Sequence, residues 1–211
     1  MKKILWLCNQ RLSTESLKET GTWTAPLARE LHDSKLVDVV YVTVGDTKNT
    51  IIEEVNGIKQ WLIPNLKTCG YGQIANEKSC KEVLRIANVE NPDIIHIWGV
   101  ESFWGSLMLK GYINKPCIIE IQGILSSYYH FYYGGMKMEE LFNSIHTKEI
   151  LMPNRTLFNK KNIFRKRGEY EKKVLQVAKY INIQSTWAKE QVMNISNNAQ
   201  FFNTSIIFRP A

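Results

Sequence analysis

The sequence predicts an α/β fold, a Rossmann-like doubly wound parallel sheet of about seven strands with helices on both faces. Short apolar runs suited to buried strands alternate with helical patterns along the chain. With 211 residues and 44% hydrophobic content, the chain can bury one sizeable core. No internal repeat or low-complexity linker divides it, so residues 1–211 are expected to form a single domain.

The expected strands are the apolar runs, and the expected helices lie between them. Strands are predicted at residues 3–8, 37–44, 58–63, 93–98, 116–121, 180–184 and 205–208. Helices are predicted at residues 23–32, 74–87, 102–110, 136–145, 169–178 and 186–195. Right-handed crossovers through these helices would make the sheet parallel.

The first apolar run is interpreted as a strand rather than as a targeting segment. It extends only from Ile4 to Cys8 before polar Asn9, which is too short for a secretion signal. Leu7 stands where lipoprotein cleavage needs a small residue. No run approaches the roughly 20 apolar residues of a membrane-spanning helix. Pro26 falls near the start of the first helix, where its missing amide donor costs little.

Four later segments have mainly structural interpretations. The 136–145 helix carries apolar residues at helical spacing, which predicts a core-facing stripe of Met138, Leu141, Phe142 and Ile145. Residues 151–162 lack periodicity and are expected to form a loop. The GxGxxA sequence at residues 70–75 starts too far after its strand to bind a dinucleotide and is interpreted as a turn. Glu82 and Glu90 are expected to be solvated.

The four cysteines favour a reducing cytoplasm over a disulfide framework or a metal site. They form no CxxC pair and have no histidine at metal-ligand spacing; they are Cys8, Cys69, Cys80 and Cys117. We therefore expect no bound metal.

The net charge of +7 is concentrated in one segment. Residues 147–173 hold nine Lys or Arg residues against three Glu residues. An anionic membrane surface would attract such a segment, and the expected contact residues are Lys160, Lys161, Phe164, Arg165, Lys166 and Arg167. Binding to nucleic acid and a merely solvated surface are the alternatives.

The expected ligand site lies where the winding of the sheet changes direction. In a doubly wound sheet, ligands bind beyond the carboxyl ends of the strands at this crevice. The common strand order 3-2-1-4-5 would place it between the first strand and the 93–98 strand. Gly21 and Thr22 close a long loop before the first helix, whose free amides favour a phosphate. A simple turn with a Thr N-cap explains them equally well.

Two pairs of residues follow the fourth and fifth strands. His96 and Glu101 are expected to face the crevice and bind a polyol, with Trp98 or Trp104 stacking on the sugar. A histidine within a strand is, however, also common in a core. Gln122 and Gly123 end the fifth strand.

An aromatic segment, residues 120–135, follows the fifth strand and includes Tyr128 and His130. Rings with polar tips suit carbohydrate or an interface. A loop folded on its own aromatic cluster is the alternative.

The order of these segments resembles a known family. PDIIHIWGVES is followed by PCIIEIQG and then by a helix carrying Glu171 before INIQSTWAKE. This series resembles the N-terminal domain of GT-B glycosyltransferases of family 4, particularly bacterial members that build surface polysaccharides, including lipopolysaccharide. The resemblance covers essentially the whole chain.

The resemblance implies the acceptor-binding half of a retaining, metal-independent enzyme. A C-terminal domain, expected to be absent from this chain, would bind a UDP- or GDP-sugar and supply an E-x7-E carboxylate pair, so the main catalytic residues are unknown. Gly21 and Thr22 would approach the donor phosphates, while His96, Glu101 and the pair after the fifth strand would line the acceptor side. That pair is Gln122-Gly123 here, where many relatives have His-Gly.

The expected acceptor is a glycan or lipid-linked sugar, and the expected location is the cytoplasm, peripheral to the inner face of the cell membrane. The chain alone is expected to be inactive. The alternative is a non-catalytic Rossmann-like module that binds carbohydrate or nucleic acid, although no nucleic-acid motif is present and nucleic acid is not the expected partner. A receiver-like signalling domain would need acidic residues after the first strand, where Asn9 and Gln10 stand.

Overall fold

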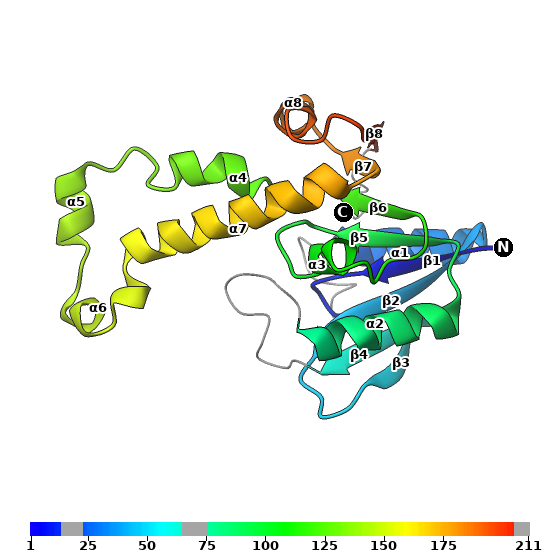
Figure 1. The fold of residues 1–211 in the computed structure, drawn as a ribbon. Coiled ribbons are helices and arrows are strands. Elements are labelled where there is room, and N and C mark those ends of the chain that lie inside the picture. The colour runs from blue at the N-terminus through cyan, green and yellow to red at the C-terminus, as the bar shows by residue number, and fades with distance from the viewer. Residues whose placement is uncertain (14–22, 65–75, 205–211) are drawn as a thin grey trace.

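The computed structural model describes residues 1–13, 23–64 and 76–204 and contains one eight-stranded sheet (Figure 1). The strand order is β3-β4-β2-β1-β5-β6-β7-β8. The strands are β1 (Lys2–Leu7), β2 (Val37–Gly45), β3 (Ile51–Val55), β4 (Ile58–Pro64), β5 (Ile94–Trp98), β6 (Cys117–Glu120), β7 (Tyr180–Ile183) and β8 (Gln200–Asn203). Within the described residues, every pairing is parallel except that of β3 with β4.

Helices connect the parallel strands. They are α1 (Thr24–Ser34), α2 (Glu77–Glu90), α3 (Gly105–Leu109), α4 (Leu125–Tyr128), α5 (Met138–Asn143), α6 (Thr147–Leu151), α7 (Leu157–Val177) and α8 (Thr186–Met193), with short 3-10 helices η1 (Tyr129–Phe131) and η2 (Pro153–Arg155). Asn76 caps α2 by accepting a hydrogen bond from the Ser79 amide over 2.6 Å. No helix in the described ranges has the length and apolar character needed to cross a bilayer.

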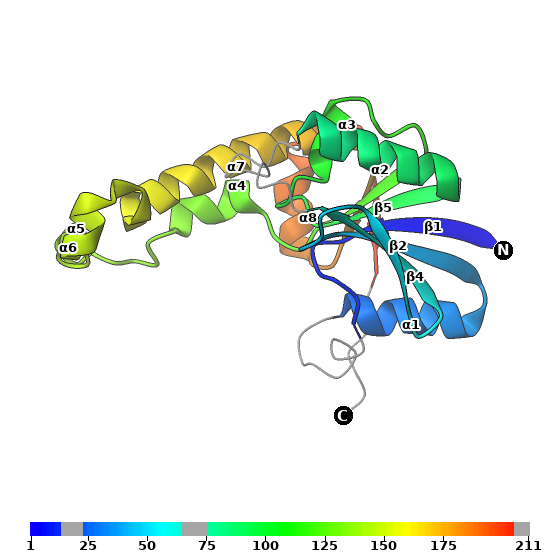
Figure 2. The same ribbon diagram turned by 90° about the horizontal axis from the view of Figure 1, so that it is seen from below.

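Both faces of the sheet are covered, as the sequence predicts (Figure 2). Successive residues of a strand point to opposite faces. Leu7 shares a core cluster with Val83 of α2 and Val174 of α7. Its neighbour Trp6 belongs to a second cluster, together with Ala28 of α1. The α/β, Rossmann-like fold class is therefore confirmed.

The predicted central strand order is also confirmed, and the sheet is extended at both edges. β4, β2, β1, β5 and β6 follow one another as the 3-2-1-4-5 order requires. β3 adds an antiparallel edge strand that the sequence analysis missed. The turn before β4 is Asn56-Gly57, with both residues at positive φ (51° and 80°), which is the pattern of a tight hairpin. The edge strand β8 lies before the predicted 205–208 strand, which is outside the described residues.

The second half of the loop predicted at residues 151–162 belongs to a long helix, while the first half contains only the 3-10 helix η2 and the last residue of α6. α7 begins at Leu157, with Thr156 as its N-cap, and continues for 21 residues. The earlier prediction of a helix at 169–178 captured only its second half. We call residues 129–166 the helical arm; Figures 1 and 2 both show its α5–α6 end extending away from the sheet.

The prediction of a core-facing stripe on the 136–145 helix was wrong. Leu141 is buried, but Met138 and Phe142 are largely exposed. The helical spacing is real, yet this helix lies on the arm, where few residues are available to cover it.

The expectation that Glu90 is solvated was also wrong. Glu90 lies at the end of α2 and is buried. Trp61 Nε1 donates to its Oε1 over 2.9 Å, and the ammonium groups of Lys3 and Lys59 each lie 3.2 Å from a carboxylate oxygen. Burial acts to raise the pKa of Glu90, but these three donors outweigh it and hold the pKa below its usual value.

Candidate functional site

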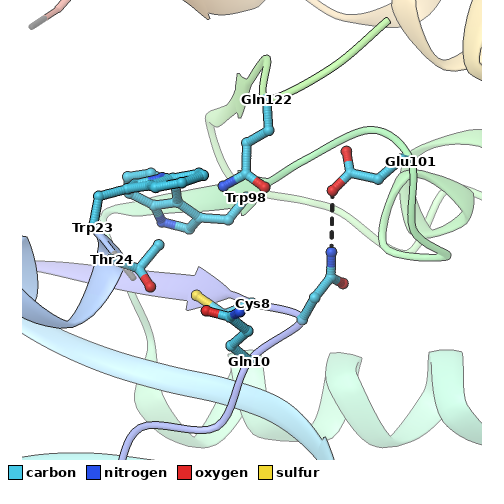
Figure 3. A pocket seen from close by; sticks show the side chains of 8 residues that line it. Cys8, Gln10, Trp23, Thr24, Trp98, Glu101 and Gln122 are labelled. Carbon is cyan, nitrogen blue, oxygen red and sulfur yellow. Dashed lines mark hydrogen bonds between the residues drawn. The ribbon is translucent and has the colours of Figure 1, made fainter. Parts of the chain in front are cut away.

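A cavity of about 200 Å³ opens at the predicted crevice, where β1 and β5 end side by side. Residues from the ends of β1, β5 and β6 and from the start of α1 surround it (Figure 3). They are Cys8, Asn9, Gln10, Trp23, Thr24, Trp98, Glu101 and Gln122. This is the topological switch point of the sheet, because β2 lies on one side of β1 and β5 on the other.

The turn after β5 requires a glycine. Gly99 has φ +92°, a conformation that L side chains rarely adopt, and its amide donates to the Glu120 carbonyl over 3.1 Å. A Cβ atom at this position would collide with the carboxylate of Glu101. Gly99 therefore allows the chain to turn back so that Glu101 borders the cavity.

Glu101 is the principal charged group of the cavity. Its Oε1 accepts a hydrogen bond from Asn9 Nδ2 over 3.3 Å, shown as a dashed line in Figure 3. Its Oε2 is buried and has no hydrogen-bond partner in the described part of the chain. Burial raises the pKa of Glu101, and Glu171 adds to the rise, while its own amide and Arg167 oppose it.

Arg167 and Glu171, both on α7, stand behind Glu101. Arg167 Nη2 donates to the main-chain carbonyl of Glu101 over 2.9 Å. Glu171 accepts hydrogen bonds from the amides of Leu125 and Ser126 at the start of α4 and from the Ser126 hydroxyl. Burial lowers the pKa of Arg167, although the two carboxylates act to raise it. α7 thus anchors both the Glu101 loop and the start of α4.

Aromatic rings form one side of the cavity. Trp98 is stacked on His96, with ring centroids 4.6 Å apart, and lies 4.8 Å from Trp6. Trp98 Nε1 is buried and finds no acceptor among the described residues. Trp23 is the more exposed indole of the lining and lies before α1. The site therefore combines apolar ring surface with unpartnered donor and acceptor atoms.

Comparisons with known proteins show which solved structures share this fold. No protein-family model matches the sequence, and no curated protein sequence matches it. Among solved structures, a sucrose-phosphate synthase from Thermosynechococcus elongatus superposes with a TM-score of 0.59 at 11% identity, over 97% of this chain and 48% of that one. UGT2 from Phytolacca americana, in complex with UDP-2-fluoro-glucose and pterostilbene, superposes with a TM-score of 0.54 at 8% identity, over 100% and 55%.

The likeness shows a GT-B-type fold. Identities this low carry the fold alone. The chain spans about half the length of the two solved structures, 48% of one and 55% of the other.

His96 lies beneath the cavity and does not line it. Its ring packs against both Trp6 and Trp98, and its Nε2 is 3.5 Å from the Glu120 carboxylate. Trp104, expected to offer a face for stacking, is fully buried, and its Nε1 donates to Asn9 Oδ1 over 2.9 Å. That expectation for Trp104 was wrong.

The residues predicted after the fifth strand divide between two places. Gln122 reaches the cavity, as Figure 3 shows. Gly123 follows it and leads toward Tyr128, which stacks on Trp187 with centroids 5.5 Å apart. His130 lines a separate cavity of about 430 Å³ between α4 and α8. Tyr128 and His130 are thus not part of the cavity at the switch point.

Gly21 and Thr22 lie outside the described residues, although the next two residues line the cavity. Sequence reasoning missed Asn9, Gln10, Trp23 and Thr24 as site residues. Their positions in the sequence could have identified them. Asn9 and Gln10 closely follow β1, and Trp23 and Thr24 stand at the start of the next helix. Within the described ranges, no three His, Cys, Asp or Glu side chains gather where they could hold a metal ion.

The predicted membrane residues do not share one surface. Arg167 is turned toward Glu101 and is partly buried, so its assignment to a membrane surface was wrong.

Lys161 lies over the Tyr133 ring at 4.2 Å, and Phe164 packs on Tyr132 at 5.4 Å. Exposed Arg165 pairs with Glu169 on the same helix over 2.6 Å. Lys160 and Lys166 are also exposed.

Proposed function

We propose that this chain is the acceptor-binding half of a retaining glycosyltransferase that transfers a sugar from a UDP- or GDP-sugar to a glycan or lipid-linked glycan. The proposed pathway class is cell-surface polysaccharide synthesis in the bacterial cytoplasm, at the inner face of the membrane. The observation that carries the proposal is a cavity lined by Glu101 and Trp98, each of which has a buried polar atom, Oε2 and Nε1, with no hydrogen-bond partner among the described residues. The GT-B-type fold supports it.

Sugar hydroxyls could satisfy both atoms, because each hydroxyl can donate one hydrogen bond and accept others. Glu101 Oε2 would accept from one hydroxyl and Trp98 Nε1 would donate to another. The Gln122 amide can do either. The cavity, about 200 Å³, is smaller than the roughly 300–1,000 Å³ of sites for drug-sized ligands. It suits one sugar ring.

The chemistry assigned to this half is positioning. The acceptor hydroxyl attacks the anomeric carbon of the donor on the face from which the nucleoside diphosphate departs, so that the configuration is retained, and the hydroxyl proton passes to an oxygen of the departing diphosphate. Holding that hydroxyl close to the anomeric carbon supplies much of the acceleration in such a reaction. The donor and its departing phosphate would be bound by a second lobe, consistent with a chain that spans about half of each matched structure. Glu101 is a positioning residue in this scheme.

Sugar binding can be tested on the 211-residue chain itself. The indole N–H signals in NMR spectra report on individual tryptophans, and we expect methyl glycosides to shift the Trp98 and Trp23 signals first. Glu101→Gln, which removes a charged acceptor, should weaken binding about tenfold. Gln191→Ala, at the separate cavity beside α8, is the matched control and should leave binding unchanged.

Two further measurements separate the alternatives. We expect no turnover of UDP- or GDP-sugars by this chain alone, and measurable transfer would contradict the assignment of the donor site to another lobe. A panel of glycosides that leaves the Trp98 and Trp23 signals unmoved, while RNA shifts signals on the helical arm, would instead favour a non-catalytic nucleic-acid module.

A further inference from the structure

The outer end of the helical arm carries exposed apolar side chains. Ile150 and Leu151 at the end of α6 and the following Met152 are 68%, 80% and 47% exposed. On α5, Met138 is 55% and Phe142 59% exposed. We call these five residues the apolar tip. All five lie on the two short helices at the end of the arm or directly after α6, and several exposed apolar groups at one end of an arm are a candidate interaction surface.

The arm has a small core of its own, which contacts Phe142 of the tip but leaves that ring 59% exposed. Leu141 is buried, and Phe158 of α7 lies 5.4 Å from Phe142 and 5.9 Å from Tyr133 between ring centroids. These contacts hold α5 against α7. Both views place α5 and α6 at the end of the arm farthest from the sheet (Figures 1 and 2). The described part of the domain therefore leaves the tip largely uncovered.

The net positive charge of the arm indicates that an anionic surface would cover the tip. Residues 136–166 contain seven Lys or Arg residues and three Glu residues. Two of the Glu carboxylates accept hydrogen bonds at helix starts, from the amides of Lys137 over 2.6 Å and of His146 over 3.2 Å. Cations flank the tip at Lys148 and Arg155. The tip is thus an apolar group within a cationic segment.

We propose that the apolar tip inserts into the headgroup region of an anionic lipid bilayer, with the basic residues of the arm on the lipid phosphates. Apolar side chains beside Lys and Arg are the pattern of segments that lie in a membrane interface, where apolar burial and attraction to anionic lipid add together. A polyphosphate chain such as a nucleic-acid backbone would bind the basic residues but would leave the apolar side chains of Ile150 and Leu151 in water. Lys160 and Lys166 remain proposed contacts to anionic lipid, as in the sequence analysis. The residues that insert are those of the apolar tip.

Insertion of the tip would determine where the protein acts, independently of sugar transfer. α7 runs from the arm to the sheet and carries Arg167 beside the candidate site. An arm resting on a bilayer would therefore hold the cavity at a fixed distance from the lipid surface.

Vesicle flotation tests the proposal directly. The chain should float with phosphatidylcholine vesicles containing phosphatidylglycerol and not with phosphatidylcholine alone. Ile150→Ser combined with Leu151→Ser should lower partitioning about tenfold, with an unchanged circular dichroism spectrum. Leu36→Ser is the matched control, because Leu36 is 73% exposed and lies between α1 and β2, away from the arm; it should float normally.

Two further variants test the apolar and the electrostatic parts of the proposal separately. Leu151→Trp retains an apolar tip, so it should float and its added fluorescence should shift to shorter wavelength on anionic vesicles. Lys148→Glu with Arg155→Glu should lower partitioning by a similar factor. Equal flotation of the parent, the serine variant and the glutamate variant would overturn the proposal. So would a parent chain that dimerises in solution through the tip, or one that binds RNA but not vesicles.

Discussion

Arg167 of α7 donates a hydrogen bond to the main-chain carbonyl of Glu101 over 2.9 Å, joining residues 66 positions apart. This contact fixes the loop that places the Glu101 carboxylate at the cavity. It also brings one cation near two buried carboxylates, those of Glu101 and Glu171, whose pKa values burial raises.

Removal of this cation should destabilise the fold most at high pH. Arg167→Met removes the cation that opposes the rise in the pKa of Glu101 and that also interacts with Glu171, so the pKa of both carboxyls rises further. A carboxyl whose pKa is raised in the folded chain costs stability as pH rises from its usual pKa to the raised one, and we expect the free energy of unfolding to fall by about 3 kcal/mol at pH 8 and by less at pH 5. Urea unfolding at both pH values measures this. Arg165→Met, in an exposed pair, should cost under about 1 kcal/mol; equal losses at pH 5 and 8 would contradict the assignment.

Gly99 should not accept a side chain. Gly99→Ala combines unfavourable φ with a collision against the Glu101 carboxylate, and we expect a loss of about 2–4 kcal/mol in the free energy of unfolding. Gly111→Ala is the control: its φ is also positive, at +73°, but nothing lies within 4 Å of its Cβ position. It should lose only about 1 kcal/mol. Equal losses in the two variants would show that contact with Glu101 is unimportant.

The buried carboxylate of Glu90 should stabilise the fold in a pH-dependent way. Its pKa is lower in the folded chain than its usual value, so its contribution is present above that usual value and is lost as pH falls through the folded pKa. Glu90→Gln should therefore cost about 3 kcal/mol at pH 7, and the difference from the parent should shrink toward pH 3. Glu82→Gln, on the same helix, weakens a more exposed pair with Arg85 and serves as control. A difference that grows on acidification would refute this account.

Gly168→Ala should have the opposite of the usual effect of a glycine-to-alanine substitution in a helix. Gly→Ala in an exposed helix interior normally stabilises by about 0.5–1 kcal/mol. At Gly168 the added Cβ would lie 2.8 Å from the Ser126 Cα atom, so α7 would have to move away from α4. We expect Gly168→Ala to destabilise by about 1–3 kcal/mol in urea unfolding. A stabilised variant would show that α4 yields easily.

The position of the site could be predicted from sequence because it follows from topology. Alternating apolar runs and helices imply a parallel sheet, and the sheet order fixes where β1 and β5 diverge. Glu101 and Gln122 could be found as the polar residues that directly follow two of these strands. The hairpin before β4 could also have been found, because Asn56-Gly57 is a strong turn signal.

Other features required tertiary contacts. The first half of α7 is held by aromatic contacts with residues more than 15 positions away, such as Tyr133 with Phe158, and it shows no continuous apolar stripe. Glu90 appears in the sequence as an ordinary helix carboxylate, and only the neighbouring Trp61 and lysines reveal its burial. The inward turn of Arg167 could not be distinguished from that of its exposed neighbours in a run of basic residues.

The ring cluster of Trp98, His96 and Trp6, in which Trp98 lines the cavity, provides an intrinsic spectroscopic signal of cavity occupancy. Closely packed indoles couple their electronic transitions, and the near-ultraviolet circular dichroism of such a group depends on ring geometry. A molecule that enters the cavity and tilts Trp98 would change this signal without any label. Candidate acceptors could then be screened on the unmodified chain.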